Sequence, residues 1–176
     1  GYPFCRGRIF DVVEKDCGQY DTVTEVMWVT GAALFIRLAD YREVGGLDDH
    51  FFAHMEEIDL CWRLRSRGKK LVCIPQSVVY HVGGATLKKE NPRKTFLNFR
   101  NNLLMLYKNL PDKELEHVLF IRGILDRVAA LVFYLKKDRA NARAVMQARR
   151  EFEDIRYSFA ASRIENIIKS TDEMIP

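Results

Sequence analysis

The sequence lacks any long apolar run, and no segment approaches the ~18 consecutive apolar residues that a membrane-spanning helix needs. It has four cysteines, but they form no Cys-x-x-Cys pair, and no histidine lies at zinc-finger spacing from them. Four reduced thiols are therefore the simpler interpretation. Internal repeats are absent as well. The chain begins Gly1-Tyr2-Pro3, without an initiator Met or an apolar leader, so we expect a piece of a longer protein.

The composition indicates an ordinary folded chain. Its 176 residues are 48% hydrophobic and 30% charged, which excludes intrinsic disorder and collagen-like sequence. This length suits one domain, or one domain with an appendage, and a core that needs no metal or disulfide. The net charge of +4 suits nucleic acid, anionic lipid or a phosphorylated small molecule, and does not choose among them.

The first half of the chain alternates apolar runs with helical patterns. Residues 1–25 are rich in turns, and we expect little regular structure there. Val26–Ile36 is almost continuously apolar, which predicts a strand buried on both faces, with Gly31 at a bulge or a close backbone approach. The other expected elements are helices over Leu38–Val44 and Glu56–Arg67 and strands over Leu71–Ile74 and Val78–Val82. A helix between apolar strands is typical of an α/β sheet.

The sequence after Lys94 has the pattern of helices throughout. One apolar stripe, at steps of three and four, contains Phe96, Phe99, Leu103, Leu106 and Leu110. Pro111 ends this helix. Further helices are expected over Lys113–Lys137, Asp138–Ser158 and Ser162–Met174. We therefore divide the chain into a sheet-containing part, residues 1–94, and a helical region, residues 95–176.

Three carboxylates lie in the first turn of the second expected helix. Glu56, Glu57 and Asp59 have an ordinary structural interpretation, because acidic residues favour a helix N-terminus. Asp59 can also pair with Arg63, four positions later. The stripe of this helix that must face the sheet runs through Glu57, Leu60, Cys61, Leu64 and Gly68. Burial beside Glu56 would raise the pKa of Glu57, so Glu57 is the candidate for proton abstraction and Glu56 for binding a substrate hydroxyl.

A second group of candidates follows the last expected strand. His81 ends that strand, and two glycines and a basic loop come next. A histidine there is usually only hydrogen-bonded, but near acidic residues it becomes a candidate metal ligand. Lys88, Lys89 and Arg93 could cover a diphosphate, and a solvated loop is the alternative interpretation for each.

Several separated motifs occur in one order: WVTGAALFIR, EVGGLDDHFF, MEEIDLCWRLRSRGKKLVCIPQSVVYHVGG and FLNFRNNLLMLYKNL. In this order they resemble the second half of the family 2 glycosyltransferases, rhamnosyl- and galactofuranosyltransferase-like members in particular. The resemblance extends from residue 1 to about residue 110. It implies an α/β fold, namely the C-terminal portion of a GT-A (Rossmann-like) sheet domain, followed by a helical C-terminal extension.

The resemblance also implies a reaction and a role for each candidate. In the family, a carboxylate of a Glu-Asp-x-Asp motif deprotonates the acceptor hydroxyl, which attacks the anomeric carbon with inversion and releases a nucleoside diphosphate. The motif falls here on Glu56, Glu57 and Asp59, so Glu57 takes the base role, with Glu in place of the usual Asp. The other implied roles are acceptor binding by Glu56, Asp48 and Asp49, donor-sugar binding by Trp28, Gly31 and Ala32, diphosphate binding by Lys88, Lys89 and Arg93, and metal binding by His81. Core packing is the alternative for Trp28, Gly31 and Ala32.

The Asp-x-Asp metal motif of the family's nucleotide-binding half is absent from this sequence. We therefore expect a C-terminal fragment, inactive by itself, with a divalent metal (Mn²⁺ or Mg²⁺) held largely by the missing half. The expected partners are a nucleotide-sugar donor and a glycan or lipid-linked acceptor. A sheet edge without neighbouring strands would favour a homodimer. The family's work in polysaccharide biosynthesis for the cell envelope implies a cytoplasmic location, peripheral on the inner face of the membrane.

Two alternatives remain open. The chain could be a non-catalytic basic module for anionic lipid or nucleic acid. Its basic residues would be Arg139, Arg143, Arg149 and Arg150. Glu153 and Asp154 follow closely, and no aromatic-plus-basic motif appears, so we expect no nucleic acid. The apolar run Val128–Leu135, ended by Lys136-Lys137, could contact a membrane peripherally or lie buried against the sheet or another chain.

Overall fold

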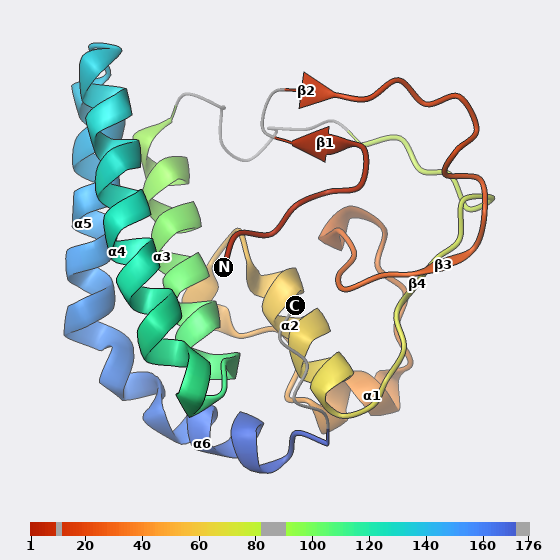
Figure 1. Ribbon diagram of the computed structural model, residues 1–176. Helices are drawn as coiled ribbons and strands as arrows, with labels where there is room; N and C mark the ends of the chain where they lie inside the picture. Colours follow the sequence, from red (N-terminus) through yellow and green to blue (C-terminus); the bar gives the residue numbers. More distant parts are fainter. Residues whose placement is uncertain (10–11, 82–90, 172–176) are drawn as a thin grey trace.

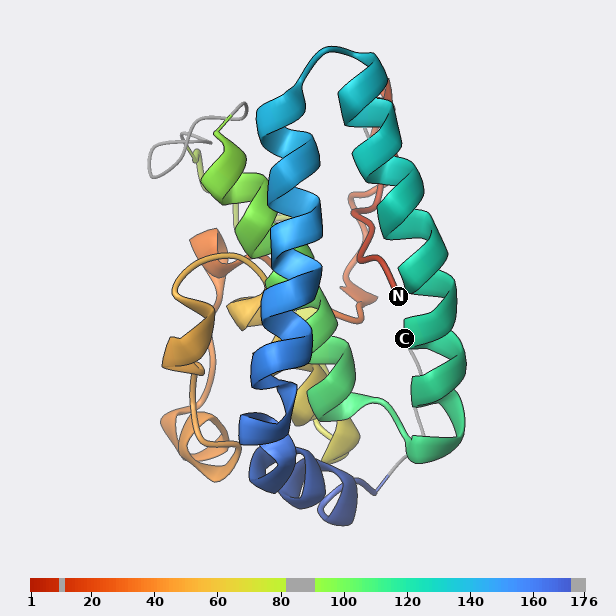
Figure 2. The ribbon, with the colours of Figure 1, turned by 90° about the vertical axis from the view of Figure 1, so that its left-hand side faces the viewer.

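The computed structural model describes residues 1–9, 12–81 and 91–171 (Figure 1). The second half of the chain is a bundle in which α3 (Pro92–Asn109), α4 (Asp112–Leu135) and α5 (Arg139–Ile155) lie side by side (Figure 2). A 3-10 turn, η3 (Arg156–Phe159), leads into α6 (Ala160–Ile168), which packs against the C-terminal end of α3. The helical region expected after Lys94 is thus a packed bundle.

The first half contains short elements and packs against α3 through its longest helix, α2. In chain order the elements are β1 (Arg8–Ile9), β2 (Val12–Val13), β3 (Thr24–Glu25), η1 (Gly31–Ala33), α1 (Leu38–Glu43), η2 (Asp49–Phe51), α2 (Glu56–Ser66) and β4 (Val72–Cys73). The strands form two antiparallel pairs, β1 with β2 and β3 with β4. The fold is therefore a mixture of helices and two small sheets. The strands of the described residues do not form the larger Rossmann-like sheet that the resemblance implies.

The long strand predicted over Val26–Ile36 is wrong. Val26 still donates a hydrogen bond to the carbonyl of Leu71, at 2.9 Å, but the segment then leaves the sheet and turns at η1. The partner strand β4 has only two residues, so the ladder cannot continue along the apolar run. Five apolar side chains of the segment pack, partly buried, against the core beside α2, and Phe35 is 89% exposed. The continuous apolar character therefore indicated contact with a core here, and not strand pairing.

The strand predicted over Val78–Val82 is also wrong for the residues that the structure describes. Residues 78–81 form no strand, and residue 82 lies outside the described residues. Tyr80 is 99% exposed, and both Val78 and Val79 are exposed as well. A strand needs a neighbour to satisfy its backbone groups, and no described segment lies beside this one as a partner. Of the strand predicted over Leu71–Ile74, the pair Val72–Cys73 is present.

Apart from the last one, the predicted helices are confirmed to within a few residues, and their ends have local causes. The helix predicted over Ser162–Met174 is present as α6, which ends at Ile168, and residues 172–174 lie outside the described residues. The side chain of Asn91 accepts a hydrogen bond from the N–H of Arg93 at the start of α3, with Pro92 in the first turn. Asp138 accepts from the N–H of Asn141 at the start of α5. Gly68 follows α2 with a φ of 73°, a conformation that glycine adopts without strain.

The molecule has two apolar clusters. The larger one lies in the bundle and includes Phe51, Leu103, Leu106 and Phe152. The smaller one lies between α2 and the first-half loops, and its fully buried members are Leu60 and Cys61. The stripe of α2 predicted to face inward is confirmed by this cluster, although it meets the irregular segment 26–36 and not a strand. The partly buried Trp28 contacts both clusters.

Residues 1–9, 12–81 and 91–171 contain no helix that is long and apolar enough to cross a membrane.

Candidate active site

The loop that leads into α2 has unusual backbone geometry. Phe52, His54 and Met55 have φ values of 61°, 70° and 75°, in the left-handed region that residues with a Cβ rarely adopt. Met55 is the N-cap of α2, and its side chain makes no capping hydrogen bond. Left-handed residues persist only where surrounding contacts hold them, and they concentrate at functional sites.

Asn101 of α3 supplies the contacts that hold this loop. Its side-chain nitrogen Nδ2 lies 2.8 Å from each of three carbonyl oxygens, those of Phe51, Ala53 and His54. Asn101 is fully buried, so these bonds form away from water. The beginning of α2 is therefore anchored to the middle of α3.

Asp59, in the first turn of α2, lies in a buried network of charges. Its carboxylate pairs with Arg63 at 2.8 Å and with Nζ of Lys108 at 2.9 Å, and its Oδ1 accepts from Nδ2 of Asn109 at 2.8 Å. Asp59 is 0% exposed. The predicted pair of Asp59 with Arg63 is confirmed, and the buried charge of Asp59 is neutralised by two cations.

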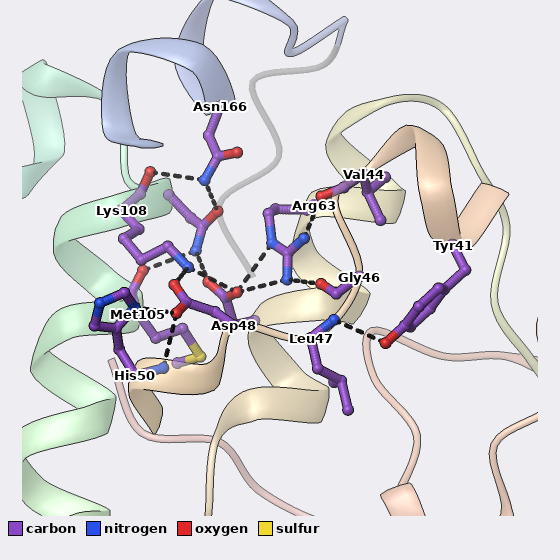
Figure 3. Close-up of polar contacts among 12 residues, drawn as sticks. Tyr41, Val44, Gly46, Leu47, Asp48, His50, Arg63, Met105, Lys108 and Asn166 are labelled. Carbon is purple, nitrogen blue, oxygen red and sulfur yellow. Dashed lines mark hydrogen bonds and ion pairs between the residues drawn. The ribbon is translucent and has the colours of Figure 1, made fainter. Parts of the chain in front are cut away.

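The same network holds the loop after α1. Arg63 donates to the backbone carbonyls of Val44 and, at 2.7 Å, Gly46, while Lys108 also binds Asp48 at 2.8 Å (Figure 3). Asp48 in turn pairs with the ring of His50 at 2.8 Å. Burial would raise the pKa of Asp48, but the hydrogen bonds from Lys108 and His50 outweigh it and lower this pKa to about 2. Both oxygens of Asp48 thus have partners within the protein.

Glu56 and Glu57 differ from these satisfied carboxylates. One oxygen of each, Oε2, is buried and has no hydrogen-bond partner among the described residues. Burial raises the pKa of Glu57, and the negative charge of Glu56 raises it further. Backbone N–H groups, including that of Gly31, oppose this rise only in part. A carboxylate with a raised pKa and a free oxygen is suited to accept a proton.

Gly31 brings the segment 26–36 against this carboxylate. It begins the turn η1, where the side chain of Thr30 accepts from the N–H of Ala32. A Cβ added at Gly31 would lie 3.7 Å from Cβ of Glu57, so the two backbones approach closely. Gly31 and Ala32 are exposed beside Glu57, whereas Trp28 is partly buried between the two cores. The predicted close approach at Gly31 is confirmed, and its neighbour is Glu57.

Positive charge at the start of α3 lies near the same loop. The guanidinium of Arg93 is 5.4 Å from the centre of the Phe52 ring. Burial lowers the pKa of His54, and the positive charge of Lys94 lowers it further. Nε2 of His54 is buried without a partner among the described residues. Lys88 and Lys89, the other predicted diphosphate ligands, lie outside the described residues.

The remaining predicted site residues are less closely grouped. Asp49 is exposed in the first turn of η2, and His81 is exposed at the end of a described segment. No described contact links His81 to the α2 carboxylates. Within residues 1–9, 12–81 and 91–171, no group of three or more His, Cys, Asp or Glu side chains could hold a metal ion. The described residues therefore do not form a divalent-metal site on their own, and the metal role of His81 stays a prediction.

Sequence reasoning missed Asn101, Lys108 and Asn109. All three are buried polar residues on a helix that we took as apolar core. The stretch NFRNNLLMLYKN has six Asn, Arg or Lys residues among apolar ones, which could have indicated buried hydrogen bonding. Their hydrogen-bond partners lie about fifty positions away in the chain, so a local sequence pattern cannot predict which residues these partners are.

The chain is similar in sequence to parts of several glycosyltransferases. The chain is 31% identical over 141 residues to the Pre-mycofactocin glycosyltransferase of Mycobacterium tuberculosis, a match that covers 74% of this chain and 29% of that protein. It is 38% identical over 56 residues to the N-acetylglucosaminyl-diphospho-decaprenol L-rhamnosyltransferase of the same organism (32% of this chain, 18% of that protein). It is 33% identical over 69 residues to Rhamnosyltransferase WbbL of Escherichia coli (39% of this chain, 25% of that protein).

These relatives, at modest identity, support a glycosyltransferase family for the chain. The chain spans less than a third of the length of each of them. No family model matches the chain, and no solved structure matches it.

Proposed function

We propose that this chain is the acceptor-side, catalytic part of an inverting glycosyltransferase of the GT-A fold. The enzyme would transfer a hexosyl or deoxyhexosyl group from a nucleotide-sugar to a glycan or lipid-linked acceptor. The observation that carries the proposal is the carboxylate of Glu57, which has a buried, partnerless oxygen and a raised pKa at the start of α2. The names of the relatives support the same class of reaction.

In this reaction Glu57 takes the proton of the acceptor hydroxyl. The hydroxyl oxygen then forms a bond to the anomeric carbon, and the bond between that carbon and the diphosphate oxygen breaks. Glu57 lies in the first turn of α2. There the helix dipole and nearby backbone N–H groups hold its carboxylate in a fixed orientation. A general base of this kind contributes roughly 10²–10⁴-fold to the rate.

The surroundings of Glu57 suit the other parts of the proposed substrate. Gly31 and Ala32 are exposed beside Glu57 and carry no large side chain, which suits contact with a sugar ring. Arg93 and Lys94 bring positive charge to the same loop, which suits a diphosphate. Glu56, next to the base, is the proposed partner of an acceptor hydroxyl.

The experiment is a Glu57→Gln exchange in a longer protein that joins this chain to a nucleotide-binding half. Transfer of radiolabelled sugar would be measured from UDP-, GDP- and dTDP-sugars to lipid and glycan extracts. We expect the exchange to lower kcat by roughly 10²–10⁴-fold, because glutamine cannot accept the proton. In the unchanged enzyme the rate should fall as the pH drops through the raised pKa of Glu57. The chain by itself should transfer no sugar.

The matched control is Glu116→Gln, which removes an exposed carboxylate at the start of α4. This variant should keep full activity. Transfer that is equally fast in Glu57→Gln and Glu116→Gln would remove Glu57 from the mechanism and return it to a role at the helix end.

A further inference from the structure

One face of α4 is apolar and exposed along most of its length. It is formed by Phe120, Ile124, Leu125, Val128, Leu131 and Leu135, which are between 44% and 71% exposed. We call these six side chains the outer face of α4. They recur at steps of one, three and four, so they form one continuous stripe. Exposed apolar stripes of this extent mark surfaces that bind a protein or a membrane.

The opposite face of α4 is fixed to the bundle. Asp126 is 0% exposed, pairs with Arg122 at 3.1 Å and with Arg149 of α5 at 2.8 Å, and accepts a hydrogen bond from the hydroxyl of Tyr2 at 2.7 Å. Arg122 also donates to Asn102 of α3 and, at 2.9 Å, to the carbonyl of Gly1. Rotating α4 would break this network, so the outer face stays on the outside of the molecule. The prediction that Val128–Leu135 is buried against the sheet is wrong, because Val128, Leu131 and Leu135 are exposed. Burial of this run against another chain stays a prediction.

A row of positive charge borders the outer face. Arg139, Arg143 and Arg150 are exposed on α5 and line an open groove of about 960 Å³ between α5 and α4. Leu131 and Tyr134 form the α4 wall of this groove. Lys136 and Lys137 follow at the C-terminal end of α4.

The acidic side chains of this groove offset only part of the positive row. Glu151 is already paired with Arg100 at 2.8 Å, and Asp154, which also lines the groove, is a single carboxylate against three arginines. A lipid surface offers acyl chains and, above them, anionic headgroups. The apolar stripe is complementary to the acyl chains, and the line of arginines is complementary to the headgroups.

We propose that α4 and α5 dock on the surface of a membrane that contains anionic lipid. The outer face of α4 enters the boundary between headgroups and acyl chains, and the arginine row of α5 binds the headgroups. Tyr134 suits this boundary, because its ring is apolar and its hydroxyl is polar. A second copy of this chain fits the surface less well, since it brings its own excess of positive charge, +4.

The proposed membrane surface is continuous with the rim of the candidate active site. A second groove, of about 520 Å³, shares Arg143, Gln147 and Glu151 with the first. It is also lined by Phe52 and Arg93, in and beside the loop that leads into α2. The docking proposal does not depend on sugar transfer, but it would place the loop that leads into α2 near a lipid surface.

The test is sedimentation of the full chain with vesicles of phosphatidylcholine alone or of equal parts phosphatidylcholine and phosphatidylglycerol. Two variants address the two halves of the surface. The apolar variant is Leu131→Gln with Leu135→Gln, and the charge variant is Arg139→Gln with Arg143→Gln and Arg150→Gln.

The chain should bind the anionic vesicles and lose binding at high salt. The charge variant should lower the partition coefficient roughly 100-fold, at about fivefold per arginine. The apolar variant should lower it at least tenfold, on the order of the transfer free energy of one leucine.

Matched controls exchange exposed residues away from this surface. The apolar control is Ile164→Gln with Ile168→Gln on α6, and the charge control is Arg8→Gln with Arg37→Gln and Arg42→Gln. Both should bind like the unchanged chain. The proposal is overturned if the chain binds neither kind of vesicle, or if controls and variants lose binding equally. It is also overturned if sedimentation equilibrium shows a dimer that the apolar variant dissociates, because the outer face would then be covered by a second copy.

Discussion

Asp59 and Glu57 lie two positions apart on α2, and the fold treats their charges in opposite ways. Asp59 faces α3, where Lys108, Asn109 and Arg63 satisfy its carboxylate. Glu57 faces the segment 26–36, where one of its oxygens is buried without a partner and its pKa is raised. Side chains two positions apart on a helix point to different faces. Asp59 and Glu57 therefore lie in different environments although they are close in sequence.

The difference separates structural charge from charge that is available for chemistry. A buried carboxylate with two cations has its desolvation compensated, and it holds elements together. A carboxylate with a free buried oxygen lacks that compensation and can gain a proton partner from a substrate. Asp59 thus fixes the relative positions of α2, α3 and the loop that follows α1. Because Glu57 also lies on α2, these contacts fix the position of Glu57 as well. Exchanges at the two positions should have different consequences.

The largest effect on stability is expected from Asp59→Ala. The exchange leaves Arg63 and Lys108 buried without their shared anion, and breaking a buried pair in this way costs about 3–5 kcal/mol. Urea unfolding followed by circular dichroism measures the loss. Asp154→Ala, at an exposed position, is the control and should change the free energy of unfolding by less than about 0.5 kcal/mol. A loss equal to that of the control would mean that the network around Asp59 contributes nothing to folding.

A smaller effect, which disappears in acid, is expected from Asp48. Its folded-state pKa is lowered to about 2 from the ordinary value of 3.8, so the folded chain binds fewer protons than the unfolded chain between these values. This contribution to stability is present above about pH 4 and is lost as the pH falls toward 2. Asp48→Asn should therefore flatten the acid limb of the free energy of unfolding against pH. Asp49→Asn, next to it and exposed, should leave that limb unchanged.

The smallest effect on stability is expected from Glu57→Gln. This exchange should stabilise the folded chain, whereas the exchanges at Asp59 and Asp48 should destabilise it. The pKa of Glu57 is raised in the folded state, so its charge costs stability once the pH exceeds that pKa. The exchange should increase the free energy of unfolding at pH 8 and change it little at pH 3, where the carboxyl is already protonated. Urea unfolding at the two pH values measures both. A decrease at pH 8 would show that Glu57 is a satisfied structural charge like Asp59.

Local sequence patterns predicted the helices and the buried stripe of α2 because helix periodicity and end signals act within a few residues. They also predicted that Glu57 heads this stripe and that Gly31 allows a close backbone approach. The strand over Val26–Ile36 failed for a different reason. An apolar run indicates that side chains pack against a core, while a strand also needs a partner of equal length, and β4 has two residues.

By itself, the sequence determined where all helices but the last begin and end, to within a few residues, which of their faces are apolar, and which carboxylates gather at the start of α2. Only the tertiary structure decided how the charges are used. Lys108 and Asn109 reach Asp59, and Asn101 reaches the loop before α2, across about fifty residues of chain. Only the packing of α4 shows that its apolar outer face is exposed beside the arginines of α5. Helix periodicity depends on neighbours one turn away, whereas a buried charge and an exposed apolar stripe depend on which distant segments pack beside them.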